Sequence, residues 1–196
     1  MLMKKIIIIL TSFLLFTPFF VMGNVVGIDD PPEITDDIND TDLPNLDIES
    51  AWFYENPDEP EYLYTAIKLQ SLNVKMSACI SISWSFNGKE YVCGFDIYSW
   101  KENVFRSGDP KRATYWQWTS MPECEGQTDF DTHIITWKIP KENIGSPTQG
   151  DVLSETRAAA VPGYPLSLVY FFTGRDYRDF APNEQDTYGL EYIIKF

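Results

Sequence analysis

The segment from Ala78 to Tyr98 restricts the fold of this chain more than any other. Its sequence, ACISISWSFNGKEYVCGFDIY, alternates between apolar and polar residues on both sides of Asn87-Gly88. Asn-Gly between two alternating runs is typical of a two-residue β-hairpin turn, because both turn positions need a positive φ angle. We expect Phe86 to pair with Lys89, so that one face covers a core and the other meets solvent. The apolar face then carries Ile80, Ile82, Trp84, Phe86, Tyr91, Cys93 and Phe95.

The rest of the body also follows a period of two residues. DIESAWFYE (47–55) and EYLYTAIKLQSL (61–72) flank the turn segment NPDEP, which predicts a second hairpin. No segment keeps a 3.6-residue apolar period. We therefore predict an all-β fold, an antiparallel β-sandwich of about eight or nine strands spanning residues 47–196. Further strands are expected at 113–119, 132–139, 166–173 and 190–196, with an ambiguous one at 155–160 and a single helical turn at 141–145.

The first 23 residues have the features of a secretory signal peptide. Lys4 and Lys5 precede the apolar run Ile6–Met22, and Val21 and Gly23 fit the −3 and −1 positions of a cleavage site. The alternative is an uncleaved N-terminal anchor, because the run has about the minimum length for spanning a bilayer. In both cases we expect the rest of the chain to be secreted or extracytoplasmic, with no membrane contact beyond this segment.

Acidic residues are concentrated near the start of the exported chain. Thirteen acidic residues and no Lys or Arg lie between Asn24 and Ile67, and the whole chain has a formal net charge of −14. Like charges and prolines favour an extended chain, so we expect residues 24–46 to form a disordered acidic linker. The net charge argues against a nucleic-acid partner, because phosphate contacts need clustered Lys and Arg. One His and three Cys exclude a zinc finger.

The same acidic stretch offers a candidate calcium site. Calcium binds six to eight oxygen ligands, and this stretch supplies several carboxylates. The EF-hand spacing is absent, so a solvated spacer is the favoured interpretation and calcium is the alternative. Asp47 is the best candidate ligand because it adjoins the first strand, and Asp40 and Asp42 are its companions. We expect no other cofactor.

Asn39-Asp40-Thr41 is an N-glycosylation sequon. Glycosylation of Asn39 is expected only in a host that glycosylates exported chains.

Three tryptophans are the candidate ligand-binding residues. Trp116 and Trp118 are two residues apart in a predicted strand, so their side chains would share one face about 7 Å apart. Such a pair could stack sugar rings, and Trp100 in the neighbouring loop could complete the surface. The alternative is that Trp116 and Trp118 fill the core, as large aromatic residues often do. The remaining tryptophans lie on patterned strands and are expected in the core: Trp52, Trp84 and Trp137.

An exported protein tends to oxidise its cysteines in pairs. Cys79 and Cys93 should lie on opposite faces of the hairpin, which makes Cys124 the expected partner of one of them. We favour a Cys93–Cys124 disulfide over Cys79–Cys124. The alternative is three reduced thiols, with Cys93 buried as a small apolar residue.

The pattern HIITWKIPKENIGSPTQGDVL (133–153) resembles exported β-sandwiches of the family 9 carbohydrate-binding module and DOMON type. The matching residues are Ile139-Pro140, Ile144-Gly145 and Gly150-Asp151, and the opening segment 46–69 is similar to the first hairpin of that group. The resemblance implies a β-sandwich that binds sugars or other small ligands, often with calcium near the strand ends. It transfers no catalytic residue to this chain.

These observations lead to one expected function and two alternatives. We expect a non-catalytic, exported binding or surface-interaction module, whose partner is a polysaccharide held by the tryptophans. The first alternative is a structural cell-surface domain that contacts another surface protein. The second is a calcium-dependent hydrolase that uses carboxylates. Nucleophilic catalysis is not indicated, because no Gly-x-Ser-x-Gly or papain-like cysteine context occurs in the sequence.

Overall fold

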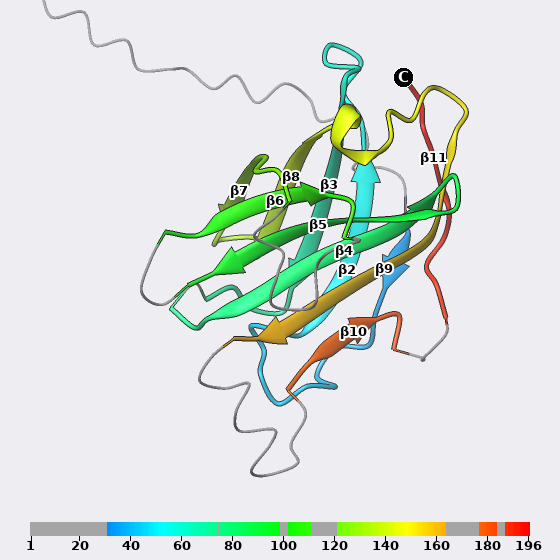
Figure 1. Cartoon of the computed structure of the whole chain (residues 1–196). Helices are drawn as coiled ribbons and strands as arrows, with labels where there is room; N and C mark the ends of the chain where they lie inside the picture. The colour runs from blue at the N-terminus through cyan, green and yellow to red at the C-terminus, as the bar shows by residue number, and fades with distance from the viewer. Residues whose placement is uncertain (1–30, 74, 99–101, 111–120, 164–176, 184–186) are drawn as a thin grey trace, which may run out of the picture.

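The computed structural model describes residues 31–73, 75–98, 102–110, 121–163, 177–183 and 187–196. These residues form two antiparallel sheets that pack face to face, so the predicted all-β sandwich is confirmed (Figure 1). The first sheet has the strand order β1 (Ile34–Thr35), β2 (Ile48–Tyr54), β3 (Tyr62–Leu69), β8 (Ile134–Pro140) and β7 (Glu125–Asp129).

The second sheet has six strands. Their order is β10 (Asp179–Ala181), β9 (Val152–Pro162), β4 (Ala78–Phe86), β5 (Lys89–Ile97) and β6 (Val104–Gly108), and β11 (Tyr192–Ile193) also pairs with β9. Four of the described strands were not expected, β1, β6 (Val104–Gly108), β7 (Glu125–Asp129) and β10, and each has five residues or fewer. The predicted helical turn is the 3₁₀ helix η2 (Lys141–Ile144), which ends at Gly145 with a φ angle of 86°.

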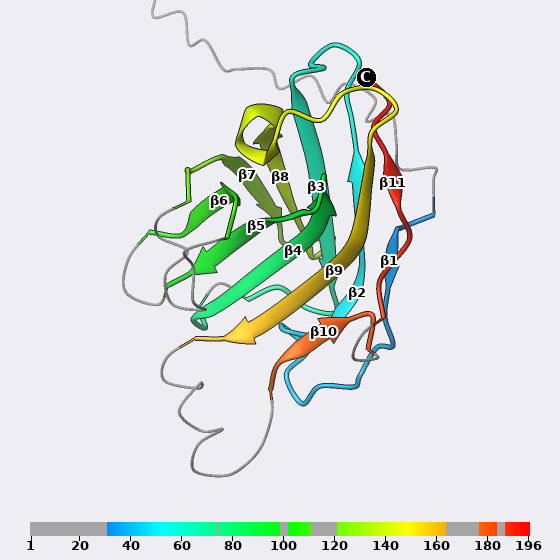
Figure 2. The same ribbon diagram turned by 45° about the vertical axis from the view of Figure 1, so that its right-hand side comes forward.

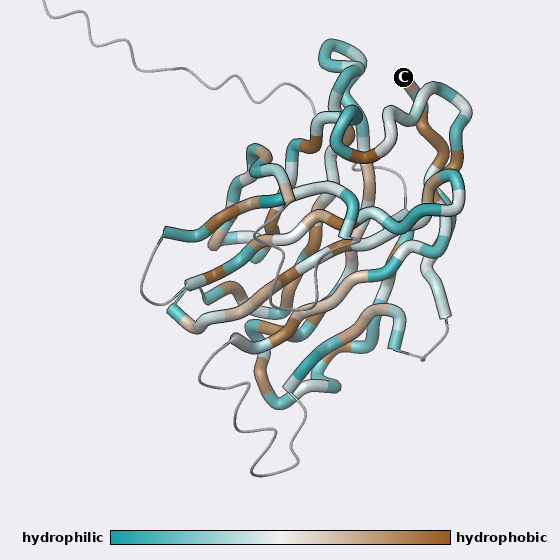
Figure 3. Tube along the Cα trace, in the orientation of Figure 1, coloured by the Kyte–Doolittle hydropathy of each residue, from teal (hydrophilic) through white to brown (hydrophobic). Residues whose placement is uncertain are grey.

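The β4–β5 hairpin forms in the predicted register. Asn87 and Gly88 have φ angles of 51° and 69°, which satisfies the two positive φ angles that a type I′ turn requires. Phe86 pairs with Lys89, and the pairing continues along the hairpin without a register shift. The predicted apolar face lies in the core between the sheets. Figure 3 shows the alternation of hydrophobic and hydrophilic residues along the strands.

Two of the three tryptophans that were expected in the core are there. Trp84 and Trp137 are fully buried, one from each sheet. Trp84 meets the ring of Phe53 edge to face at 5.5 Å, and Trp137 meets Phe105 in the same way at 6.0 Å. These contacts between β4 and β2, and between β8 and β6, pack the two sheets against each other.

The prediction for Trp52 is wrong, because its side chain is only partly buried. A bulge between Ile48 and Ser50 shifts the register of β2 against β3. After this bulge Ala51 and Phe53 face the core, and the residue between them faces outward. The extra residue therefore reverses the face that a strict period-two pattern assigns to Trp52.

The expected linker is part of the domain from residue 31 onward. β1 pairs with β2, and Ile34 and Leu46 are completely buried. The backbone N–H of Leu190 donates to the carbonyl oxygen of Glu33 at 2.6 Å, so β1 lies beside the C-terminal segment (Figure 2). The prediction of a disordered linker over residues 24–46 is therefore wrong for its described part, because a few spaced apolar residues anchor an otherwise acidic segment.

Several predictions fall outside the described residues. These are the signal peptide (1–23), the start of the linker (24–30), the strands at 113–119 and 166–173, and Trp100, Trp116 and Trp118. Among the residues that are described, no helix has the length and hydropathy needed to cross a membrane.

Candidate cation site

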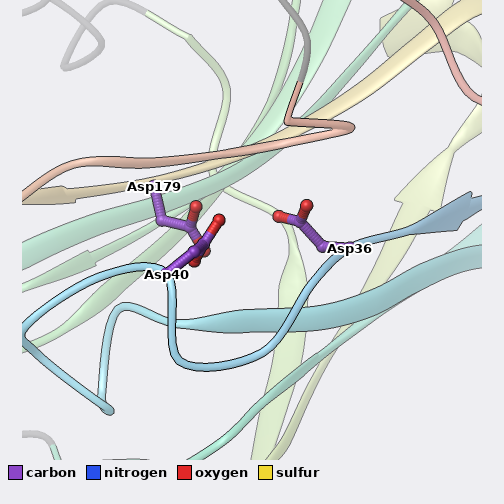
Figure 4. A group of neighbouring side chains, drawn as sticks. All are labelled: Asp36, Asp40 and Asp179. Atoms are coloured by element: carbon purple, nitrogen blue, oxygen red, sulfur yellow. The ribbon is translucent and has the colours of Figure 1, made fainter.

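Three aspartate side chains from opposite ends of the described chain lie together. Asp36 follows β1, Asp40 lies in the loop between β1 and β2, and Asp179 is the first residue of β10. One carboxylate oxygen of each residue lies within 4.8 Å of those of the other two. Figure 4 shows Asp40 and Asp179 close together, with Asp36 pointing toward them.

The start of β2 supports both segments of this cluster. Asp179 Oδ2 accepts a hydrogen bond from the backbone N–H of Ile48 at 2.7 Å. The backbone N–H of Asp36 donates to the carbonyl oxygen of Glu49 at 3.2 Å. β10 is itself held by β9, where Asp179 pairs with Ala160. The sheets thus bring the acidic loop and β10 to the same place.

A fourth carboxylate, that of Asp47, lies next to the cluster. Its side chain is 0% exposed, and its Oδ2 accepts a hydrogen bond from the backbone N–H of Asn39 at 2.7 Å. The Asp47 charge raises the pKa of Asp179, and the Asp40 charge raises the pKa of Asp47, so these groups are near enough to repel one another. Burial is the largest cause of the raised pKa of Asp47.

Three buried oxygen atoms of the acidic segment have no hydrogen-bond partner. They are Asp36 Oδ2, Thr41 Oγ1 and Asp47 Oδ1. Buried polar atoms without a partner are rare in folded proteins and cost about 1–3 kcal/mol each. All three belong to the segment 36–47, which also supplies two of the three clustered carboxylates. Their coincidence with the cluster is the observation that distinguishes it from an ordinary acidic surface.

Among the described residues, no cationic side chain balances the negative charge of the cluster. Burial raises the pKa of Asp36 to about 7, and the charge of Asp179 adds to the shift. Burial also raises the pKa of Asp179 to about 6, with additions from Asp40 and Asp47. Within the described part of the chain, no Lys or Arg forms an ion pair with these groups. Near neutral pH the repulsion is relieved by protons or by a cation.

The donor atoms and their spacing fit calcium. Calcium–oxygen distances are about 2.3–2.6 Å, so two oxygens bound to one ion lie at most about 5 Å apart. The three carboxylate oxygens lie within 4.8 Å of one another and so meet this condition. The group contains no thiolate or imidazole, the ligands that softer metals prefer.

The predicted calcium ligands lie in different places. Asp40 belongs to the cluster, and Asp47 lies next to it with an oxygen that has no hydrogen-bond partner. Calcium binding by these residues stays a prediction. Asp42 is exposed and does not belong to the cluster. Asp36 was only one of several acidic residues in the stretch, and Asp179 was missed. No local signal could have identified Asp179, because only strand pairing brings β10 to the acidic loop.

The glycosylation sequon lies in the same loop. Asn39 is exposed and has a φ angle of 67°, and its Oδ1 accepts a hydrogen bond from Gln70 Nε2 at 2.7 Å. Glycosylation of Asn39 remains a prediction.

The expected disulfide is absent, since Cys79, Cys93 and Cys124 are all free. Cys93 points into the core, where its Sγ lies 3.2 Å from the Oγ1 of Thr65 on the facing sheet. Burial raises the pKa of Cys93 to about 12 and that of Cys124 to about 11. The structure therefore corresponds to the alternative of three reduced thiols, in which Cys93 packs as a small apolar residue.

No protein-family model, no curated protein and no solved structure matches this chain. The resemblance to carbohydrate-binding and DOMON sandwiches is therefore based on the sequence segments 133–153 and 46–69, and it stays a prediction.

Proposed function

We propose that this protein is an exported β-sandwich that binds calcium and acts as a non-catalytic binding or surface-interaction module. The calcium part rests on one observation: three carboxylates converge, and the segment that supplies two of them contains three buried oxygens without a partner. Export is supported by the charged start, apolar run and cleavage pattern of residues 1–23. A structural calcium ion suits such a module, because the site joins the loop before β2 to β10.

Asp36, Asp40 and Asp179 would be the direct carboxylate ligands. Asp47 and Thr41 have free oxygens in the same segment and would complete or support the ligand set. Calcium requires six to eight oxygens, so water or backbone carbonyls would fill the remaining positions. Extracellular calcium modules bind with dissociation constants of about 10⁻⁴–10⁻³ M, and we expect this range here.

Calorimetric titration of the exported chain with calcium chloride tests this proposal. We expect a single site in the wild type, and an affinity at least about tenfold lower in Asp179→Asn and in Asp40→Asn, because each removes one anionic ligand. Asp42→Asn is the matched control, since it makes the same charge change in the same loop but lies outside the cluster. If Asp40→Asn and Asp42→Asn lose the same amount of calcium affinity, the loss reflects the change in net charge and not the removal of a ligand. That result would overturn the proposal.

The ligand class of the module is proposed from the sequence. We infer a polysaccharide as the partner, stacked on Trp116 and Trp118 with Trp100 beside them. Quenching of tryptophan fluorescence by soluble glycans would support this ligand, and a Trp116→Ala, Trp118→Ala variant should lose the response. The absence of any response across a broad glycan panel would instead favour the alternative of a surface-protein partner. Hydrolysis of a glycan by the wild type would favour the carboxylate hydrolase.

A further inference from the structure

We propose that calcium fastens residues 36–45, here called the latch loop, to β10, so that the calcium concentration decides whether this loop lies against the sandwich. The inference rests on the proposed calcium site and adds a regulatory role to it. It concerns the position of one loop, because fully buried apolar residues hold the chain on both sides of the loop, whereas mainly hydrogen bonds hold the loop itself.

Both ends of the latch loop are anchored without any cation. Ile34 on β1 and Leu46 just before β2 are each fully buried. β1 pairs with β2, and the side chain of Glu33 accepts a hydrogen bond from the backbone N–H of Phe53 at 2.9 Å. The carbonyl oxygen of Asp47 accepts a hydrogen bond from Gln70 at 2.8 Å. The segments on either side of the loop therefore stay in place when the loop moves.

The latch loop itself has few apolar contacts. Ile38 is 54% exposed, and among the apolar side chains of the loop only Leu43 packs against the core. Most of its other exposed residues are polar or acidic: Asp37, Asn39, Asp40 and Asp42. Its remaining contacts with the body are hydrogen bonds. The N–H of Asp36 donates to Glu49, Asn39 bonds to Asp47 and Gln70, and Pro44 and Asn45 bond to Ser71 and Met76 near the end of the loop. The position of the loop thus depends mainly on polar interactions, and those of Asp36 and Asn39 lie on the side of the carboxylates.

The charges of the four carboxylates determine whether the loop is repelled from β10 or attached to it. Asp36 and Asp40 belong to the loop, whereas Asp179 belongs to β10 and Asp47 to the fixed segment. Without a cation, the like charges of the ionised carboxylates push the loop away from β10. A calcium ion bound between the two sides turns this repulsion into a bridge, and it also satisfies the buried oxygens that otherwise lack partners. The same four side chains therefore favour release or attachment according to the cation.

Hydrogen–deuterium exchange of the exported chain, followed by mass spectrometry, tests the latch. Peptides covering residues 36–45 are compared in millimolar calcium and in excess chelator. We expect exchange of the loop to be about tenfold slower with calcium, because amides of a detached loop exchange almost freely. The N–H groups of Asp36 and Asn39 are the sensitive reporters, since each donates a hydrogen bond in the attached loop. The β4–β5 hairpin should be unaffected and serves as the internal reference.

The variants separate the latch from the site on which it rests. Asp40→Asn and Asp179→Asn should show fast loop exchange even with calcium, whereas Asp42→Asn should behave as the wild type. Asp40 is exposed, so its variant remains informative if Asp179→Asn fails to fold. Calcium binding by calorimetry without any slowing of loop exchange would overturn the latch and leave the proposed function intact. Absence of calcium binding would overturn both.

Discussion

Asp179 is the residue on which the candidate site depends most. In the sequence it is one of several charged residues between two apolar runs, and nothing local separates it from its neighbours. In the structure it is 4% exposed, lies at the start of β10 and touches the start of β2 through Ile48. Burial of an aspartate is costly when no described cationic side chain pairs with it, and this cost is the reason for proposing a cation there.

The raised pKa values of Asp36 and Asp179 predict how stability depends on pH. Their folded-state values, about 7 and about 6, lie above the ordinary value of 3.8. Between about pH 4 and pH 7 the calcium-free folded protein therefore binds more protons than the unfolded chain. Its free energy of unfolding falls as the pH rises through this range. Thermal unfolding in chelator, followed by circular dichroism from about pH 5 to pH 8, should show this decline.

Calcium should flatten the same pH profile, because a bound cation holds the carboxylates ionised in the folded state. Asp179→Asn should show a shallower decline in chelator, and Asp42→Asn should follow the wild type. A calcium-free wild type that gains stability from about pH 5 to pH 8 would contradict the assignment of these pKa shifts.

At the scale of single elements, the register of the β4–β5 hairpin could be predicted from the sequence, whereas the bulge in β2 could not. The hairpin follows from residues that are adjacent in sequence, because the turn chemistry of Asn87-Gly88 sets the register for both strands. The bulge in β2 depends on how Ile48 and Ala51 both reach the core, which requires one extra residue between them. Alternation alone could not show this, and so the side of Trp52 was assigned wrongly.

A second element, the C-terminal strand β11, is hydrogen-bonded to Glu55, which is one partner of a buried ion pair. Lys141 Nζ on η2 lies 2.7 Å from Glu55 Oε1, and the two residues are 7% and 2% exposed. The other carboxylate oxygen of Glu55 accepts hydrogen bonds from the Tyr192 hydroxyl at 3.2 Å and from the backbone N–H of Lys195 at 2.6 Å. Glu55 thus joins β2, η2 and the C-terminal segment.

Removing one partner of this pair should be strongly destabilising. Lys141→Met leaves the Glu55 carboxylate buried without its cation, and we expect a loss of about 3–5 kcal/mol in the free energy of unfolding by urea. The double variant Glu55→Gln, Lys141→Met should recover part of this loss, because no uncompensated charge remains. Lys89→Met, at an exposed hairpin position, should change stability by less than about 0.5 kcal/mol. An unchanged urea midpoint for Lys141→Met would refute the buried pair.

At the scale of the whole molecule, the boundary of the domain lies earlier than charge and composition suggested. Residues 31–46 are acidic on average, yet Ile34 and Leu46 belong to the same hydrophobic cluster as the centres of both sheets. Average composition conceals such anchors, because two or three buried side chains are enough to fix a short segment. The domain therefore includes the loop that carries the candidate cation site.

Shortening the chain to residues 47–196 should destabilise the fold. Loss of the fully buried Ile34 and Leu46 alone is expected to cost about 3–6 kcal/mol, at roughly 1.5–3 kcal/mol for each buried side chain. A chain of residues 31–196 is the control and should keep full stability. Chemical denaturation of the two chains measures the difference, and equal midpoints would show that residues 31–46 are a linker after all.

The sequence by itself determined the all-β class, the register of the β4–β5 hairpin and the helical turn after Pro140. These features depend on residues within a few positions of one another, so local periodicity and turn chemistry are sufficient. Only the tertiary structure decided the outward side of Trp52, the inclusion of residues 31–46 and the meeting of Asp36, Asp40 and Asp179. Each of these depends on how distant strands pair, and burial of charge at such a junction has no signature along the chain.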